Sequence, residues 1–219
     1  MTYKHTLAVV QNIALCGSDS LWKFWNESGA GAAFRKHDPI PESFIIEAAA
    51  KNERLNLFYQ RTKKHIATVQ YFGSLYDKAL DFSEHDKSKF TDRNEGVPTA
   101  LFTASKISDY NMNAEENRNW RQATKHHDRS NKHHPPYWSK ISFMPDIRII
   151  EMADDWDAIS WEQYFTGNIA KYGGTDTYYK EIALPRYKFI PRQQRLIVDV
   201  LHINRTKCDL DVLRTIWMR

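Results

Sequence analysis

Cysteine is scarce in this sequence. Cys16 and Cys208 are the two cysteines among 219 residues, they lie near opposite ends, and they form no CxxC pair. This usage argues against a zinc ribbon or a disulfide framework. It favours a reducing, cytoplasmic location.

Long apolar runs and concentrations of one charge are also missing. The apolar stretch near the N-terminus is interrupted by Gln11 and Asn12, and no run approaches the ~20 residues of a membrane span. The 31 basic and 27 acidic residues, with a net charge of +4, are spread along the chain. We therefore expect no membrane association and no clear nucleic-acid binding.

The alternation typical of strands is scarce, and most long segments fit a period of 3.6 residues. This pattern predicts an all-α fold. The predicted helices run from about Glu42, from Glu53 to Leu80, from Ala114 to His127, from Asp146 onward, from Pro191 to about Ile203, and after a cap at Asp209.

Two shorter segments carry weaker signals. Ser83 followed by Asp86 resembles a capping box, which predicts a short helix that holds His85, Asp86 and Lys89. The segment 91–113 contains a glycine and a proline and predicts a loop with one short helix at most.

Histidines are concentrated in one part of the chain. Six of the nine fall between residues 65 and 134: His65, His85, His126, His127, His133 and His134. Imidazole with carboxylate suits Zn, Mn, Fe, Co or Ni. His65 also shares an apolar helical stripe with Val69 and Phe72, so it faces inward, where a bound cation would satisfy its polar ring.

The order of these motifs resembles the HD superfamily of metal-dependent phosphohydrolases. HDKSK (85–89) resembles the HDxGK motif of the HD-GYP branch, HHDRSNKHHPPYW (126–138) stands where that branch has a histidine pair, and IRIIEMADDWDAIS (147–160) resembles its ADxxDA helix. The GYP tripeptide is missing, which removes the cyclic di-GMP specificity. Over residues 60–205, TKKHIATVQ, EHDKSKF, HHDRSNKHHPPYW and EMADDWDAIS are together similar to a phage and bacterial family of unknown function.

The resemblance implies a fold and a ligand set. The fold is an HD-like helical bundle, with a helical extension over 1–52, a metal-binding domain over 53–205 and a C-terminal helix over 206–219. The metal ligands are His65, His85, Asp86 and one late aspartate. Alignment to ADxxDA selects Asp154 for that position, whereas alignment to the EMxDW of the closer family selects Asp155.

A helical wheel bears on the choice of aspartate. Arg148, Glu151, Asp155 and Glu162 form one narrow polar stripe on an otherwise apolar helix, which favours Asp155. Glu151, on this stripe, is the residue expected to orient a ligand or the attacking water.

The histidine pairs and nearby cations fill the remaining roles. We expect His127 and His134 to supply further metal ligands, and Lys89 to place its ammonium group on a phosphate oxygen. The residues expected to contact the substrate are His126, Arg129, Lys132 and His133. The pair His37 and Asp38 is followed by proline and is interpreted as a turn.

The predicted activity is hydrolysis of a nucleotide or related phosphate ester by metal-activated water. The cofactor is one or two divalent ions, among Mn, Fe, Co, Ni, Zn and Mg, and the partner is a small phosphate substrate. Two alternatives stay open at this point: an HD-like di-iron oxygenase, and a non-catalytic phage protein that sequesters a nucleotide.

Overall fold

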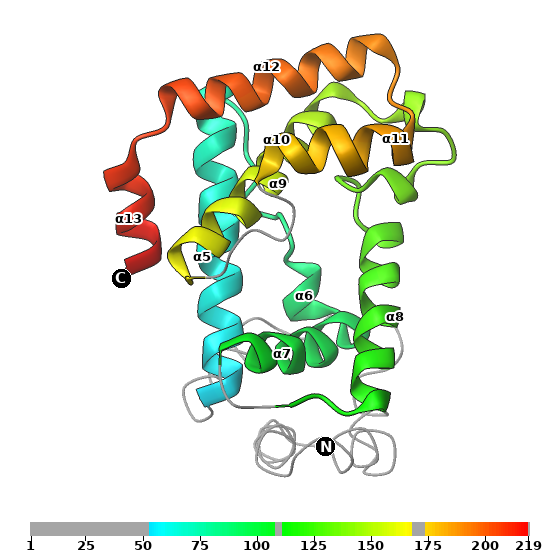
Figure 1. Ribbon diagram of the computed structural model, residues 1–219, viewed down its shortest axis with the longest axis vertical. Coiled ribbons are helices and arrows are strands. Elements are labelled where there is room, and N and C mark those ends of the chain that lie inside the picture. The colour runs from blue at the N-terminus through cyan, green and yellow to red at the C-terminus, as the bar shows by residue number, and fades with distance from the viewer. Residues whose placement is uncertain (1–52, 108–110, 168–173, 219) are drawn as a thin grey trace. The chain divides into compact units, whose positions relative to one another are not determined.

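The protein is all-α, as the periodicity predicts. The computed structural model describes residues 53–107, 111–167 and 174–218, and no strand occurs among them. The helices (Figure 1) are α5 (Glu53–Tyr76), α6 (Ser88–Thr91), α7 (Arg93–Ile107), α8 (Ala114–Ser130), α9 (Asp146–Phe165), α10 (Thr175–Tyr178), α11 (Leu184–Tyr187), α12 (Pro191–Lys207) and α13 (Leu210–Met218). The helix predicted from Glu42 and the extension over 1–52 lie outside the described residues.

The chain divides into two compact units. Unit 1 comprises residues 1–62 and 86–127, and unit 2 comprises residues 63–85 and 128–219. The domain boundaries expected after residues 52 and 205 stay a prediction. Within the described ranges, no helix is both long enough and apolar enough to cross a bilayer.

Unit 1 is packed around aromatic rings. The ring of Phe90, which lies in α6, packs against Phe58 and Tyr59 of α5, with ring centroids 5.8 and 5.3 Å apart. Phe102 of α7 stacks on Trp120 of α8, with centroids 3.9 Å apart and planes 6° from parallel. These contacts bury the apolar faces of short helices that would be marginal alone.

The loop predicted over 91–113 is wrong, because α7 is a helix of 15 residues. Gly96 and Pro98 favoured a loop but have other roles there. A Cβ at Gly96 would come within 2.8 Å of the carbonyl oxygen of Lys89, so glycine permits the close approach of α6. Pro98 is the sixth residue of α7 and lies inside the helix without ending it.

Unit 2 is built around α9, which packs against α12. Its core includes Met144, Ile149, Met152 and Ile197, all fully buried. Gln193, also buried, donates its side-chain N–H to the carbonyl oxygens of Ile141 and Met144, at 2.8 and 3.3 Å. The predicted helices from Asp146 and from Pro191 are confirmed.

The C-terminal helix packs on the later part of α5. Trp217 of α13 donates its indole N–H to Thr68 Oγ1 at 3.1 Å. Asp209 caps α13 as predicted, because its carboxylate accepts the backbone N–H of Asp211 at 2.8 Å.

The segment after α5 differs from the prediction in two ways. The helix ends at Tyr76 rather than Leu80, because Asp77 accepts the N–H of Ala79 in a turn. The short helix begins at Ser88 and excludes both His85 and Asp86. Asp86 has a φ of 56°, a left-handed conformation that cannot continue a helix.

A π-helix, Tyr179–Ala183, joins α10 to α11 without a break. Its position follows from Pro185, whose ring would clash with the carbonyl of residue 181 in a regular α-helix and which has no N–H to donate. The wider π-turn accommodates this residue.

Candidate metal centre

Two histidines and an aspartate of unit 2 converge at a buried point. His65 Nε2 lies 3.0 Å from Asp155 Oδ1, and His85 Nε2 lies 3.6 Å from the same oxygen. The two Nε2 atoms are 3.3 Å apart. The three side chains are no more than 5% exposed, and their ligand atoms form a set that could hold a metal ion.

Local structure fixes each of these three side chains. His65 faces inward from α5, one turn before Val69, and Asp155 lies in the middle of α9. The segment that leads to His85 is held by Gln70, which accepts the N–H of Phe82 at 2.5 Å and donates to the carbonyl of Leu80 at 3.0 Å.

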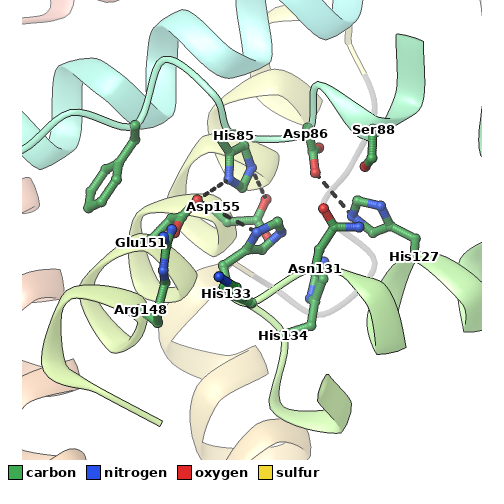
Figure 2. Close-up of polar contacts among 12 residues, drawn as sticks. His85, Asp86, Ser88, His127, Asn131, His133, His134, Arg148, Glu151 and Asp155 are labelled. Carbon is green, nitrogen blue, oxygen red and sulfur yellow. Dashed lines mark hydrogen bonds and ion pairs between the residues drawn. The ribbon is translucent and has the colours of Figure 1, made fainter. Parts of the chain in front are cut away.

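A glutamate lies behind each imidazole ring. His85 Nδ1 is 3.1 Å from Glu151 Oε1, so His85 lies between Glu151 and Asp155 (Figure 2). His65 Nδ1 is 3.6 Å from Glu162 Oε2. A ring whose Nδ1–H faces a carboxylate presents its Nε2 lone pair on the other side, as metal-binding histidines do.

The spacing of α9 explains how one helix supplies all three carboxylates. Glu151 and Asp155 are four residues apart and Glu162 follows seven residues later, so they share one helical face. Arg148, one turn before Glu151, donates to its Oε2 at 2.5 Å. The polar stripe predicted from the wheel is therefore directed at the two histidines.

His133 extends this cluster. Its ring lies 4.2 Å from that of His85, centroid to centroid, and its Nδ1 is 3.6 Å from Glu151 Oε1. His85, His133 and Glu151 form a second possible donor set. His133 was expected to contact substrate, and its position suits a ligand as well.

The charge and distances of the first set fit a divalent ion. Burial alone would raise the pKa of the Asp155 carboxyl, but His65 and His85 hold that pKa well below its usual range. Asp155 is therefore an anion. Ligand atoms each about 2.1 Å from one ion are about 3.0–3.4 Å apart in octahedral or tetrahedral coordination, which the separations of 3.0, 3.3 and 3.6 Å approach.

Asp154 faces a different environment. Its Oδ1 accepts an N–H from Asn204 of α12 at 2.9 Å, and the same amide donates to Asp157 Oδ2 at 2.9 Å. Burial raises the pKa of Asp154 well above its ordinary value and that of Asp157 to about 6. Asp154 therefore belongs to a helix–helix contact between α9 and α12.

A cavity of about 270 Å³ in unit 2 reaches Asp155. The other residues that line it are Asp128, His134, Pro135, Trp156, Ile159, Ser160, Gln163, Gly174, Thr175, Tyr178, Arg186 and Tyr187. Burial, with smaller effects of Tyr187 and Asp155, raises the pKa of Tyr178, so its phenol stays protonated and can donate. The cavity gives a small ligand access to one member of the donor set.

Asp86 and His127 form a buried network in unit 1. His127 Nε2 lies 3.0 Å from Asp86 Oδ1 (Figure 2), and its Nδ1 lies 2.9 Å from Glu95 Oε2. Lys89 pairs with Asp86, and Ser88 donates to Glu95 at 2.8 Å. Burial would lower the pKa of His127, but the two carboxylates raise it to about 9.

The other predicted residues lie nearer the surface. His126 Nε2 is 2.7 Å from Asp92 Oδ2, and these two residues form a third possible donor set with Glu95 in unit 1. Arg129 and Lys132 are exposed. In unit 2, His134 lines the cavity, with its Nδ1 4.0 Å from Asp128 Oδ1.

Several residues of these clusters were not assigned roles from the sequence. Glu162 was on the predicted stripe, and its spacing from Asp155 was the available signal. Glu95 lay in the segment taken for a loop, so no helical face could be drawn for it. Arg186 and Tyr178 share the cavity because of a π-turn, which periodicity does not predict.

A family model described as a family of unknown function (DUF5662) matches residues 54–200. No curated protein and no solved structure matches the chain. Because the match covers more than half of the sequence, this chain belongs to the family of unknown function DUF5662.

Proposed function

We propose that the protein is a metal-dependent phosphohydrolase that acts on a nucleotide or a related phosphate ester. The observation that carries the proposal is the convergence of His65 Nε2, His85 Nε2 and Asp155 Oδ1, with a glutamate behind each ring. Two imidazole nitrogens and an anionic oxygen that meet at one buried point suit a divalent cation, which would neutralise the charge and bind the nitrogen lone pairs.

The residues of unit 2 would have different roles in this reaction. His65, His85 and Asp155 would hold the ion, while Glu151 and Glu162 would keep the rings oriented with Nδ1 protonated. A divalent ion in such a site supplies a Lewis acid for the phosphoryl oxygen and lowers the pKa of water enough for it to attack phosphorus. The cavity lined by Asp155 would admit the ester.

The surroundings of the centre favour charge-driven chemistry. The three ligating side chains are buried, and electrostatic interactions are stronger in a site shielded from water. Arg148 neutralises part of the charge of Glu151, so that carboxylate can orient His85 without adding a full negative charge to the centre.

A second candidate function rests on the same donor set. Two histidines and one carboxylate with open positions are also the ligands of non-haem Fe(II) oxygenases. Zinc hydrolases use two histidines and a glutamate in a comparable way. The metal and the reaction therefore have to be tested together.

The test uses metal-stripped protein reloaded with Mn, Co, Ni, Mg or Fe. Hydrolysis is measured on p-nitrophenyl phosphate, nucleoside mono-, di- and triphosphates and cyclic dinucleotides. We expect metal-dependent hydrolysis that is lost in Asp155→Asn. Stoichiometric iron with oxygen uptake would favour the oxygenase, and recovery of intact nucleotide after long incubation would favour a sequestering protein.

A further inference from the structure

The cavity that reaches Asp155 is lined by one arginine, and this arginine has no role in the proposed metal site. Arg186 of α11 is the single Lys or Arg among the described residues that line it. Two exposed arginines of α12 have carboxylate partners, since Arg192 pairs with Asp146 at 2.7 Å and Arg205 with Asp176 at 2.5 Å. Arg186 has no ion pair with any carboxylate of the described residues.

The guanidinium group of Arg186 lies over an aromatic ring. Its Cζ lies 5.1 Å from the centroid of the Tyr187 ring. A guanidinium group on an aromatic face keeps its N–H groups available at the edge, where they can bind two oxygens of one phosphate. The stacking also lowers the entropy lost when an anion binds.

The π-turn explains why Arg186 shares the cavity with Tyr178. The two residues are eight positions apart, and in a regular α-helix their side chains would point about 80° apart. A π-turn takes up about one extra residue, which reduces the difference to about 20°. The π-helix at Tyr179–Ala183 therefore places both residues on the cavity side of one helix.

We propose that Arg186 is the anion-binding residue of this cavity and that it holds a phosphate oxygen of the ligand. Tyr178, which lines the same cavity, donates its phenol hydrogen to the same anion. The inference rests on the proposed function only in treating the bound anion as part of a substrate. Anion binding itself can be measured without hydrolysis. The inference adds Arg186 to Arg129 and Lys132 as an expected phosphate contact within unit 2.

The carboxylates of the cavity affect anion binding as well. Asp128 and Asp155 also line it, and both would repel a phosphate in the absence of a divalent ion. Phosphate should therefore bind tightly only when both the ion and Arg186 are present.

The experiment titrates Mn²⁺-loaded protein with inorganic phosphate by calorimetry, with metal content and thermal stability measured in parallel. In Arg186→Gln we expect the Kd for phosphate to rise about 10- to 100-fold, since one charge-assisted contact is lost. Arg186→Lys should recover part of the affinity. The matched control, Arg192→Gln, loses an exposed arginine outside the cavity and should bind phosphate as the wild type does.

The outcomes separate this inference from the proposed function. Affinity in Arg186→Gln within twofold of wild type, or no phosphate binding by wild type, would overturn the role of Arg186 even if esters are hydrolysed. Loss of phosphate binding in Arg186→Gln would support that role even if no ester is hydrolysed. If an ester is hydrolysed, the variant should raise KM more than it lowers kcat.

Discussion

His65 and His85 face each other through their Nε2 atoms, 3.3 Å apart, and each turns its Nδ1 toward a buried glutamate of α9. The rings come from α5 and from the turn that follows it, whereas Glu151 and Glu162 share one helical face. Three carboxylates of a single helix therefore determine where both imidazole rings point.

Glu151→Gln tests this orientation. The amide keeps the shape of the side chain but removes the charge that supports the Nδ1–H of His85. We expect the affinity for a divalent ion to fall by about 10- to 100-fold with the fold intact. Competition with a chromogenic chelator measures the change, and Glu181→Gln, an exposed glutamate of the π-helix, is the control. Equal affinities in the two variants would show that Glu151 does not support the centre.

Gly73→Ala tests the packing that holds the segment before His85. Alanine favours a helix by about 0.5–1 kcal/mol over glycine, but the new Cβ would lie 2.7 Å from the ring of Phe82, which is 1% exposed. Overpacking costs about 1–3 kcal/mol, so we expect a lower stability in urea unfolding and weaker metal binding. Ser74→Ala, next in the helix, is the control, and a stabilised Gly73→Ala protein would contradict the packing.

The network around His127 predicts a pH dependence of stability. Its pKa of about 9 exceeds the ordinary 6.5, so the folded state binds the proton more tightly than the unfolded state. The shift corresponds to about 3 kcal/mol, fully present below pH 6.5 and lost as the pH rises through 9. Urea unfolding of metal-free wild type and His127→Gln should show a large difference at pH 6 that narrows by pH 9.5. A difference that stays constant over this range would exclude a buried imidazolium.

A pair of histidine variants tests which histidines the metal uses. His65→Ala should lose metal, because it removes a ligand that contacts Asp155. His37→Ala should keep metal, because the sequence predicts a turn there; His37 lies outside the described residues. Metal content by mass spectrometry checks both, and equal losses would mean that the N-terminal segment contributes to the site.

Much of this site follows from sequence patterns where helices are long and regular. The inward orientation of His65 and the stripe that contains Glu151, Asp155 and Glu162 come directly from the 3.6-residue period. The same period places Asp154 and Asp155 on different faces of α9. On its own face, Asp154 contacts Asn204 of α12.

The features that the sequence did not predict depend on backbone conformations that the helical periodicity does not indicate. Asp86 takes a positive φ that ends the predicted helix early, and Gly96 serves a close approach rather than a break. The π-turn before Pro185 takes up about one extra residue, which rotates Arg186 around the helix axis relative to a regular α-helix. Each of these is decided by a contact with a distant residue or by local backbone geometry.

The most direct test of the central claim is the metal content of Asp155→Asn against Asp154→Asn, measured on reloaded protein. Both changes replace a carboxylate by an amide of the same shape on a buried helix, but Asp155 is anionic and Asp154 is held neutral by burial. We predict that Asp155→Asn is folded and metal-free, and that Asp154→Asn retains wild-type metal with at most a changed contact to α12. Metal lost from Asp154→Asn and kept by Asp155→Asn would contradict the account.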